Sequence, residues 1–152
     1  MRLWKGLSLI ALVAMAAGCG GDGLTRVPIQ GTLTAEGAPV ENATVQFIPA
    51  EGTVGEGAIG MTDENGKFTV ISSRDSDAGV PPGKYRVRVT RLIDGDGTIL
   101  PADAREADYP LSRESIPQPY SGMNTTLETT ISDAGGEVKV EIPKKVPGKR
   151  KS

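Results

Sequence analysis

The stretch Lys84-Tyr85-Arg86-Val87-Arg88-Val89-Thr90 shows the most regular alternation of apolar and polar side chains in this 152-residue chain. Successive side chains of an extended strand point to opposite faces, so the pattern predicts a strand with one apolar and one cationic face. We expect the apolar face, formed by Tyr85, Val87 and Val89, to lie in the protein core. The cations of the other face are interpreted as a solvated sheet surface, with an anion site as the alternative.

The same period of two recurs on both sides of this stretch. Glycines and prolines punctuate the pattern, and no segment shows a sustained helical period apart from a short helical turn predicted at 102–109. With the opening stretch, the alternating segments make seven predicted strands, the other six being 26–34, 43–48, 58–62, 67–71, 126–131 and 137–142. The pattern predicts an all-β fold, a seven-stranded Greek-key β-sandwich over residues 26–143.

A turn signal, Asp63-Glu64-Asn65-Gly66, separates the segments 58–62 and 67–71. An Asn-Gly pair supplies the positive φ angles that tight hairpin turns require. We therefore predict a hairpin in which these two segments pair directly. The side chains of Asp63 and Asn65 are explained by the turn rather than by a metal site.

Two regions lack the alternating pattern. Residues 94–124 contain clusters of glycine and proline and are predicted to form a long loop, which in a compact domain is often functional or mobile. The basic segment 144–152 follows Pro143 and is predicted to be a disordered tail. Such a tail either contacts an anionic lipid or another polyanion, or serves only as a solubilising end.

The first 18 residues have the features of an export signal. Arg2 and Lys5 precede an apolar run, Leu7 to Ala17, that is well short of the ~20 residues needed to cross a bilayer. The run ends at Cys19, the only cysteine of the chain, in a sequence that resembles a bacterial lipobox. We predict a lipoprotein signal peptide at 1–18, lipidation of Cys19 and a flexible tether at 19–25. The alternative is an ordinary secretory signal in which the cysteine is coincidental.

The composition argues against most kinds of enzyme. The chain has no histidine, so Ser-His-Asp and Cys-His catalytic arrangements are excluded. A glycosidase that uses two carboxylates is not excluded, but the acidic residues lie mainly in turns or at outward strand positions. The net charge of −2 does not indicate a nucleic-acid-binding protein. We therefore expect no catalytic residues.

The predicted loop contains the remaining candidate site residues. Asp94 and Asp96 are weak candidates for calcium ligands, but Arg105 stands where a calcium loop that begins at Asp94 would have its bidentate glutamate. We therefore predict no metal site. Tyr109 and Tyr120 are candidates for stacking against a sugar ring. The interpretation we favour is that both tyrosines pack the loop onto the sandwich.

Three groups of residues resemble the carboxypeptidase regulatory-like domain. The segment from Val27 to Phe47 resembles the opening of that domain in Val27, Gly31, Leu33, Gly37, Pro39, Val40, Asn42, Ala43, Val45 and Phe47. Thr62-Asp63-x-x-Gly66-x-Phe68 is similar to its hairpin, and Pro82-Gly83-x-Tyr85-x-Val87 to a later turn and strand. The resemblance implies a transthyretin-like sandwich that acts as an accessory or binding module, and it carries over no catalytic residue. Ile116-Pro117-x-x-Tyr120 is also similar to small bacterial transthyretin-like lipoproteins.

These observations predict a bacterial cell-envelope lipoprotein, held at the inner or the outer membrane by covalent lipid such as palmitate on Cys19. Its β-sandwich is expected to be a non-catalytic interaction or structural module with an envelope protein as partner. No cofactor is expected besides the covalent lipid, and no nucleic acid. The alternative is a glycan-binding module that uses the loop 94–124.

Overall fold

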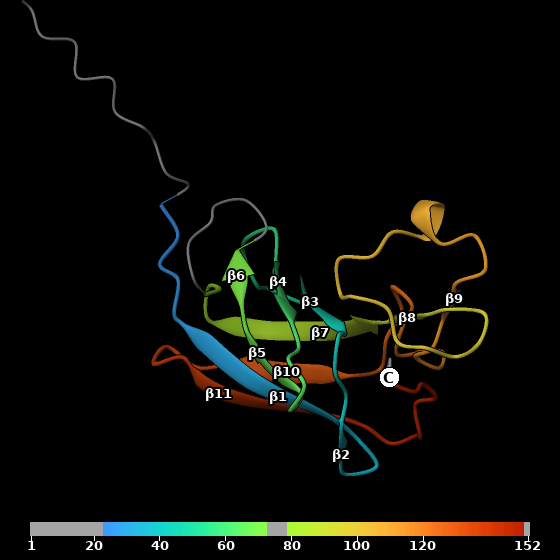
Figure 1. Ribbon diagram of the computed structural model, residues 1–152. Helices are drawn as coiled ribbons and strands as arrows, with labels where there is room; N and C mark the ends of the chain where they lie inside the picture. The colour runs from blue at the N-terminus through green and yellow to red at the C-terminus, as the bar shows by residue number, and fades with distance from the viewer. Residues whose placement is uncertain (1–22, 73–78, 151–152) are drawn as a thin grey trace, which may run out of the picture.

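The computed structural model describes residues 23–72 and 79–150. The predicted signal peptide, Cys19 and most of the predicted tether lie outside the described residues. Within them the protein is all-β, as predicted, and its strands form several sheets in an arrangement consistent with a β-sandwich (Figure 1). The only helical element in this part of the chain is a 3₁₀ turn, η1 (Glu106–Asp108), inside the segment predicted to be helical.

The first sheet is built around β1 (Ile29–Ala35). This strand pairs in parallel with β11 (Gly136–Ile142), and antiparallel with β2 (Ala38–Pro39) and β5 (Lys67–Thr69). The parallel pair joins strands from the two ends of the domain. It therefore fixes the beginning and the end of the sandwich side by side.

The second sheet contains the stretch that opened the sequence, which forms β7 (Gly83–Thr90). Its strand order is β10 (Glu128–Ile131), β7, β3 (Thr44–Pro49), β4 (Ala58–Met61) and β6 (Ile71–Ser72). A separate two-stranded ribbon, β8 (Leu92–Ile93) and β9 (Arg113–Glu114), lies beyond the end of β7 (Figure 1).

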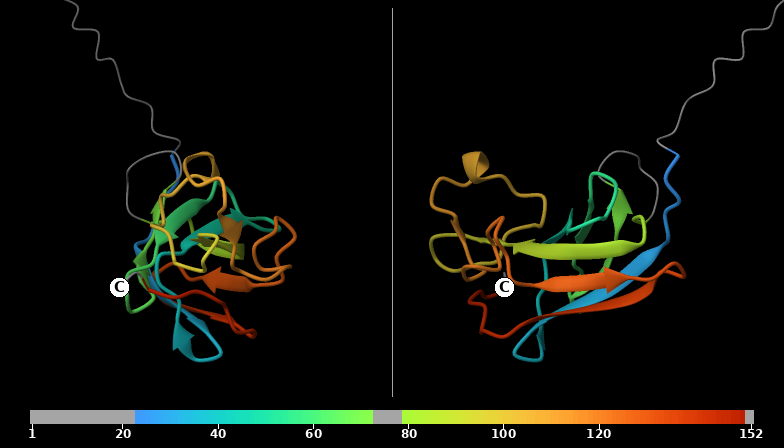
Figure 2. Two further views of the ribbon diagram at one scale, coloured as in Figure 1. Left: turned by 45° about the vertical axis from the view of Figure 1, so that its right-hand side comes forward. Right: turned by 180° about the vertical axis from the view of Figure 1, so that it is seen from behind.

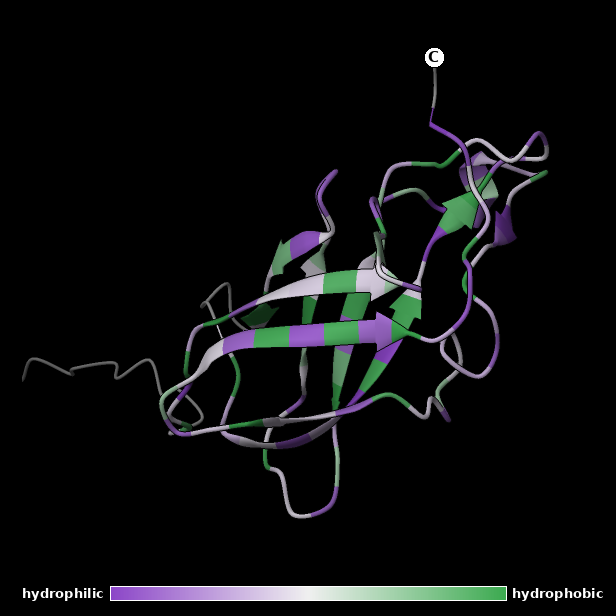
Figure 3. Ribbon diagram, turned by 90° about the horizontal axis from the view of Figure 1, so that it is seen from below, coloured by the Kyte–Doolittle hydropathy of each residue, from purple (hydrophilic) through white to green (hydrophobic). Residues whose placement is uncertain are grey.

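The core lies between the two large sheets and follows the predicted alternation, which appears as bands along the strands in Figure 3. Tyr85, Val87 and Val89 are buried, as predicted. The ring of Phe47 lies at the centre, with centroid distances of 6.1 Å to Phe68 and 6.0 Å to Tyr85. These tilted and edge-on ring contacts are favourable geometries for aromatic packing.

The predicted hairpin at 58–71 is confirmed only in part: Ile71 pairs with Ile59 of β4, whereas Lys67–Thr69 do not pair with that strand. The chain does turn at Asp63, whose Oδ1 accepts the backbone N–H groups of Asn65 and Lys67 at 2.8 and 2.9 Å. The strand that follows, however, crosses to the first sheet and pairs with β1, while β4 pairs with β3 and β6. The crossing brings Phe68 over Gly31 and Gly60, where an added Cβ atom would lie within 3.0 Å of the ring.

The cationic face of β7 is not simply solvated. Arg88 donates from Nε to the carbonyl of Ser121 at 2.7 Å and from Nη1 to Gln46 Oε1 at 3.3 Å. Arg86 donates to the carbonyl of Met123 at 3.3 Å. Two of the three predicted surface cations therefore hold the end of the long loop against the sheet.

The prediction of a disordered tail is wrong for residues 144–150. Lys149 forms a β-bridge with Thr98, and its backbone N–H and C=O bond to Gly97 and Ile99, both at 2.9 Å. The pairing partner is the predicted loop, which itself contains β9 and η1. Loop and tail therefore order each other, which neither segment reveals alone.

Candidate ligand-binding cleft

A cleft of about 690 Å³ lies where the long loop meets the C-terminal segment. Its walls come from the turn after β8, from the loop near η1, from the C-terminal segment and from the connection between β2 and β3. The lining residues are Asn42, Asp94, Asp96, Thr98, Ile99, Leu100, Pro101, Tyr109, Lys149 and Arg150. Segments that are far apart in sequence thus contribute to one site.

The wall formed by residues 94–98 is a tight turn. The Asp94 carbonyl accepts the Gly97 N–H at 2.9 Å, and the Asp94 N–H donates to the Thr98 carbonyl at 2.8 Å. Gly97 takes a φ of 91°, a conformation that glycine adopts without the strain of a side chain. Asp96 Oδ1 accepts the Thr98 N–H at 2.8 Å, so aspartate side chains stabilise this turn from within.

The Asp96 carboxylate also connects the turn to the C-terminal segment. Its Oδ2 lies 3.3 Å from Lys149 Nζ. The pKa of Asp96 is lowered to about 2, first by hydrogen bonds from Thr98 and then by Lys149. Asp96 therefore stays ionised at neutral pH, and both of its oxygens are engaged.

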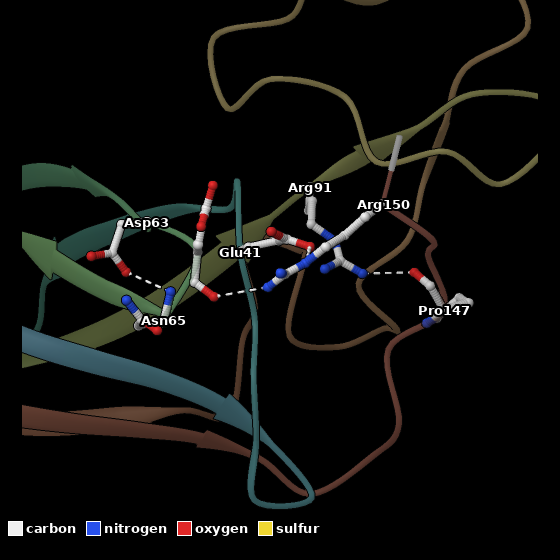
Figure 4. Close-up of polar contacts among 7 residues, drawn as sticks. Glu41, Asp63, Asn65, Arg91, Pro147 and Arg150 are labelled. Atoms are coloured by element: carbon white, nitrogen blue, oxygen red, sulfur yellow. Dashed lines mark hydrogen bonds and ion pairs between the residues drawn. The ribbon is translucent and has the colours of Figure 1, made fainter. Parts of the chain in front are cut away.

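Arg91, immediately before β8, anchors the C-terminal segment from beneath. Its side chain is buried, with Nε donating to Ser115 Oγ at 3.0 Å. Its Nη2 donates to the Pro147 carbonyl at 2.6 Å (Figure 4). Burial lowers the pKa of the guanidinium, while the carboxylates of Glu41 and Glu114 oppose that change. A buried charge of this kind needs several partners, and here the partners are the loop and the tail.

Glu114 completes the anchor on the loop side. Its Oε1 accepts the backbone N–H groups of Arg91 at 3.0 Å and of Ile116 at 2.7 Å. Burial raises the pKa of this carboxyl group, and the hydrogen bonds from the backbone act in the opposite direction. Neither Arg91 nor Glu114 lines the cleft, so their contacts explain its construction rather than its chemistry.

Arg150 closes the cleft on its other side. Its Nε lies 2.8 Å from Glu41 Oε1, and its Nη2 donates to the Glu64 carbonyl at 3.2 Å (Figure 4). Both basic residues that line the cleft are therefore paired with a carboxylate.

The structure brings together three of the four loop residues singled out from the sequence. Asp94, Asp96 and Tyr109 line the cleft, whereas Tyr120 is 8% exposed and belongs to the hydrophobic core. A site that uses both tyrosines is therefore wrong, and packing against the sandwich is confirmed for Tyr120 alone. Among the described residues no three acidic or metal-binding side chains gather around one point.

The sequence reasoning missed the three residues of the cleft that lie outside the predicted loop. Asn42 appeared only in the family resemblance, while Lys149 and Arg150 were assigned to a disordered tail. No local pattern marks them, because the cleft forms only when the C-terminal segment pairs with the loop. A hydrophobic residue in that segment, Val146, packs against the core and was the one available sign of order.

A second hollow, of about 1070 Å³, lies along the junction of the two sheets. One side offers polar groups of β1 and β5, including Gln30 and Lys67, and the other offers Ile59, Met61 and Ile71. Met61 and Ile71 are exposed apolar side chains. This groove is larger than the cleft but contains none of the four loop residues Asp94, Asp96, Tyr109 and Tyr120.

Searches of protein-family models, curated proteins and solved structures found nothing that matches this chain. The resemblance to the carboxypeptidase regulatory-like domain therefore depends only on the residues quoted for it. None of the helical segments in the described ranges is long and apolar enough to span a membrane.

Proposed function

We propose that the chain is a lipid-anchored lipoprotein of the bacterial cell envelope, and that its β-domain is a non-catalytic interaction module. The finer features of the fold, a seven-stranded Greek key of the transthyretin-like type, belong to this proposal. Cys19 carries the lipid, and the domain presents a binding surface to an envelope partner. The chain has no histidine, which supports a binding role over a catalytic one.

The observation that carries the proposal is that the start of the described chain and the cleft lie at opposite ends of the domain. The first described residues approach β1 at one end of the sandwich, whereas β8, β9, η1 and the C-terminus lie at the other end (Figures 1 and 2). A domain tethered through Cys19 would therefore hold the cleft away from the membrane. Such an arrangement suits a module that meets a partner rather than one that acts on the lipid surface.

The same arrangement of the two ends affects the interpretation of the basic C-terminal segment. The C-terminal end of the chain lies opposite the first described residues, and Lys149 and Arg150 each already pair with a carboxylate. Contact between this segment and anionic lipid next to the anchor is therefore disfavoured. We propose instead that the segment serves as a wall of the cleft.

Metabolic labelling with radioactive palmitate tests the anchor. The full chain is expressed in a bacterium, and the label is followed into the wild-type protein and into Cys19→Ala. We expect label in the wild-type protein alone, because the chain has no second cysteine. Label in Cys19→Ala, or no label in either protein, would overturn the proposal.

A further inference from the structure

We propose that the cleft between the long loop and the C-terminal segment binds a neutral, β-linked oligosaccharide. This inference rests on the proposed function as an interaction module, and it names the chemistry of the partner. The cleft volume of about 690 Å³ falls within the range of about 300–1,000 Å³ that is usual for small-ligand sites. The volume is compatible with one or two sugar rings.

The cleft offers side-chain groups that can form hydrogen bonds with a ligand. Asp94 Oδ1 accepts the Gly95 N–H at 2.6 Å, which leaves Oδ2 for a ligand, and Asn42 and Tyr109 line the same cleft with an amide and a phenol. A carboxylate only accepts hydrogen bonds, while an amide and a phenol both donate and accept. Sugar hydroxyl groups also donate and accept, so this set of three side chains complements them.

The rest of the cleft supplies apolar surface. Ile99, Leu100 and Pro101 line it together with the ring of Tyr109. The C–H faces of a pyranose pack favourably against aromatic and aliphatic groups. In a β-1,4-linked gluco-configured chain the glycosidic bond is equatorial, as the ring hydroxyl groups are, so the chain is extended and flat. An α-1,4 linkage is axial and bends the chain, so a β-linked chain offers its C–H faces to such a surface more readily.

The charges of the cleft favour a neutral ligand. Lys149 pairs with Asp96, and Arg150 pairs with Glu41. Neither cation is left to bind a strongly anionic ligand without breaking its pair. A divalent cation is disfavoured as well, because the Asp96 oxygens are already occupied by Thr98 and Lys149.

Binding of three defined tetrasaccharides to the purified full-length protein tests the inference. Cellotetraose and chitotetraose are the β-linked probes, and maltotetraose is the α-linked comparison. Binding is measured by calorimetry and by backbone amide shifts. We expect a β-linked probe to bind and to shift the amides of residues 94–98, with maltotetraose binding more weakly.

Two variants connect binding to the cleft. Tyr109→Ala is expected to weaken binding roughly tenfold or more, as for a central aromatic contact. Asp94→Asn keeps the local hydrogen bond to Gly95 but removes a carboxylate, and it should also weaken binding. Met61→Ala, in the other groove, is the matched control and should leave binding unchanged. If Tyr109→Ala fails to fold, Tyr109→Phe keeps the ring and tests the hydroxyl alone.

The inference is overturned if neither β-linked probe binds at about 1 mM, or if binding is unchanged in both Tyr109 and Asp94 variants. These results are independent of the anchor. If the protein takes up palmitate but binds no saccharide, the inference about the cleft is overturned and the lipoprotein proposal is kept. Saccharide binding by a protein that takes up no palmitate would overturn the lipoprotein proposal and keep the inference about the cleft.

Discussion

The sandwich and the loop region are held together by different interactions. In the sandwich, buried apolar side chains recur at every second residue, as Val45 and Phe47 do on β3 and Val87 and Val89 on β7. In the loop region, a few polar contacts join distant residues, such as Arg91 and Pro147, which are 56 positions apart. The first kind of interaction leaves a period in the sequence, and the second leaves none.

The largest expected effect is in the sandwich, where Phe47→Ala removes the central ring. The residue is 1% exposed and contacts two other rings. We expect a loss of about 3–5 kcal/mol in the free energy of unfolding, since burial is lost and a cavity remains. Because small domains have only about 5–15 kcal/mol of stability in total, the variant should be marginally folded. Urea denaturation followed by circular dichroism measures the change.

Met61→Ala is the control for this change, because Met61 is also apolar and on a strand but is 49% exposed. Its free energy of unfolding should differ from the wild type by less than about 0.5 kcal/mol. Equal losses in the two variants would show that the assignment of the core is wrong.

The contrast between the two regions explains what was predictable. Each of the seven predicted segments contains a strand, because strand formation follows from local alternation. The crossing of β5 to the first sheet was not predictable, since it depends on Phe68 fitting over Gly31 and Gly60. Pairing between strands is a property of the whole sandwich rather than of a segment.

The candidate site was predictable only in part. Asp94 and Tyr109 were found because a carboxylate and an aromatic ring are recognised as candidate ligand contacts from residue type alone. For Tyr120 the expected packing against the sandwich is confirmed, although its segment lacks a period and gives no local sign of its burial. Lys149 was missed because its order comes from a backbone pairing with residues 97–99. Such a pairing has no side-chain signature.

Arg91→Ala is expected to destabilise the loop region while leaving the sandwich intact. The substitution removes hydrogen bonds from a buried charged group and leaves Glu114 buried, which we expect to cost about 1–3 kcal/mol. Hydrogen exchange should accelerate at the amides of Ile99 and Lys149, which pair the loop with the tail. The amide of Leu33, inside the first sheet, should keep its protection.

Arg113→Ala is the matched control, because Arg113 lies on β9 but is exposed. Its exchange pattern should match that of the wild type. If Arg91→Ala accelerates hydrogen exchange at the Leu33 amide as much as at the Lys149 amide, the loop region and the sandwich unfold as a single unit. The contrast between the two regions would then be wrong.

A smaller effect is expected for Arg150→Ala. The arginine side chain is 66% exposed, so its pair with Glu41 should contribute only about 0.2–1 kcal/mol. Thermal unfolding should shift little, and the shift should shrink at about 1 M salt because exposed charges are screened. Glu41→Gln should have a larger effect, because Glu41 is only 12% exposed and its carboxylate also stabilises the charge of Arg91. A loss in Arg150→Ala as large as that of Arg91→Ala would show that the surface pair, rather than the buried anchor, holds the tail.

The smallest effect concerns the protonation of Asp96. Its folded pKa of about 2 lies below the ordinary value of about 3.9, so its contribution is present above pH 4 and is lost as the pH falls towards 2. Amide shifts of Thr98 should report this transition. The Thr98 hydroxyl is the largest single cause of the lowered pKa, so Thr98→Val should raise the midpoint more than Lys149→Ala, although the variant keeps the backbone hydrogen bond. A larger change of the midpoint in Lys149→Ala would mean that the tail, and not the turn itself, keeps this carboxylate ionised. The loop would then depend on the tail even at its tightest turn.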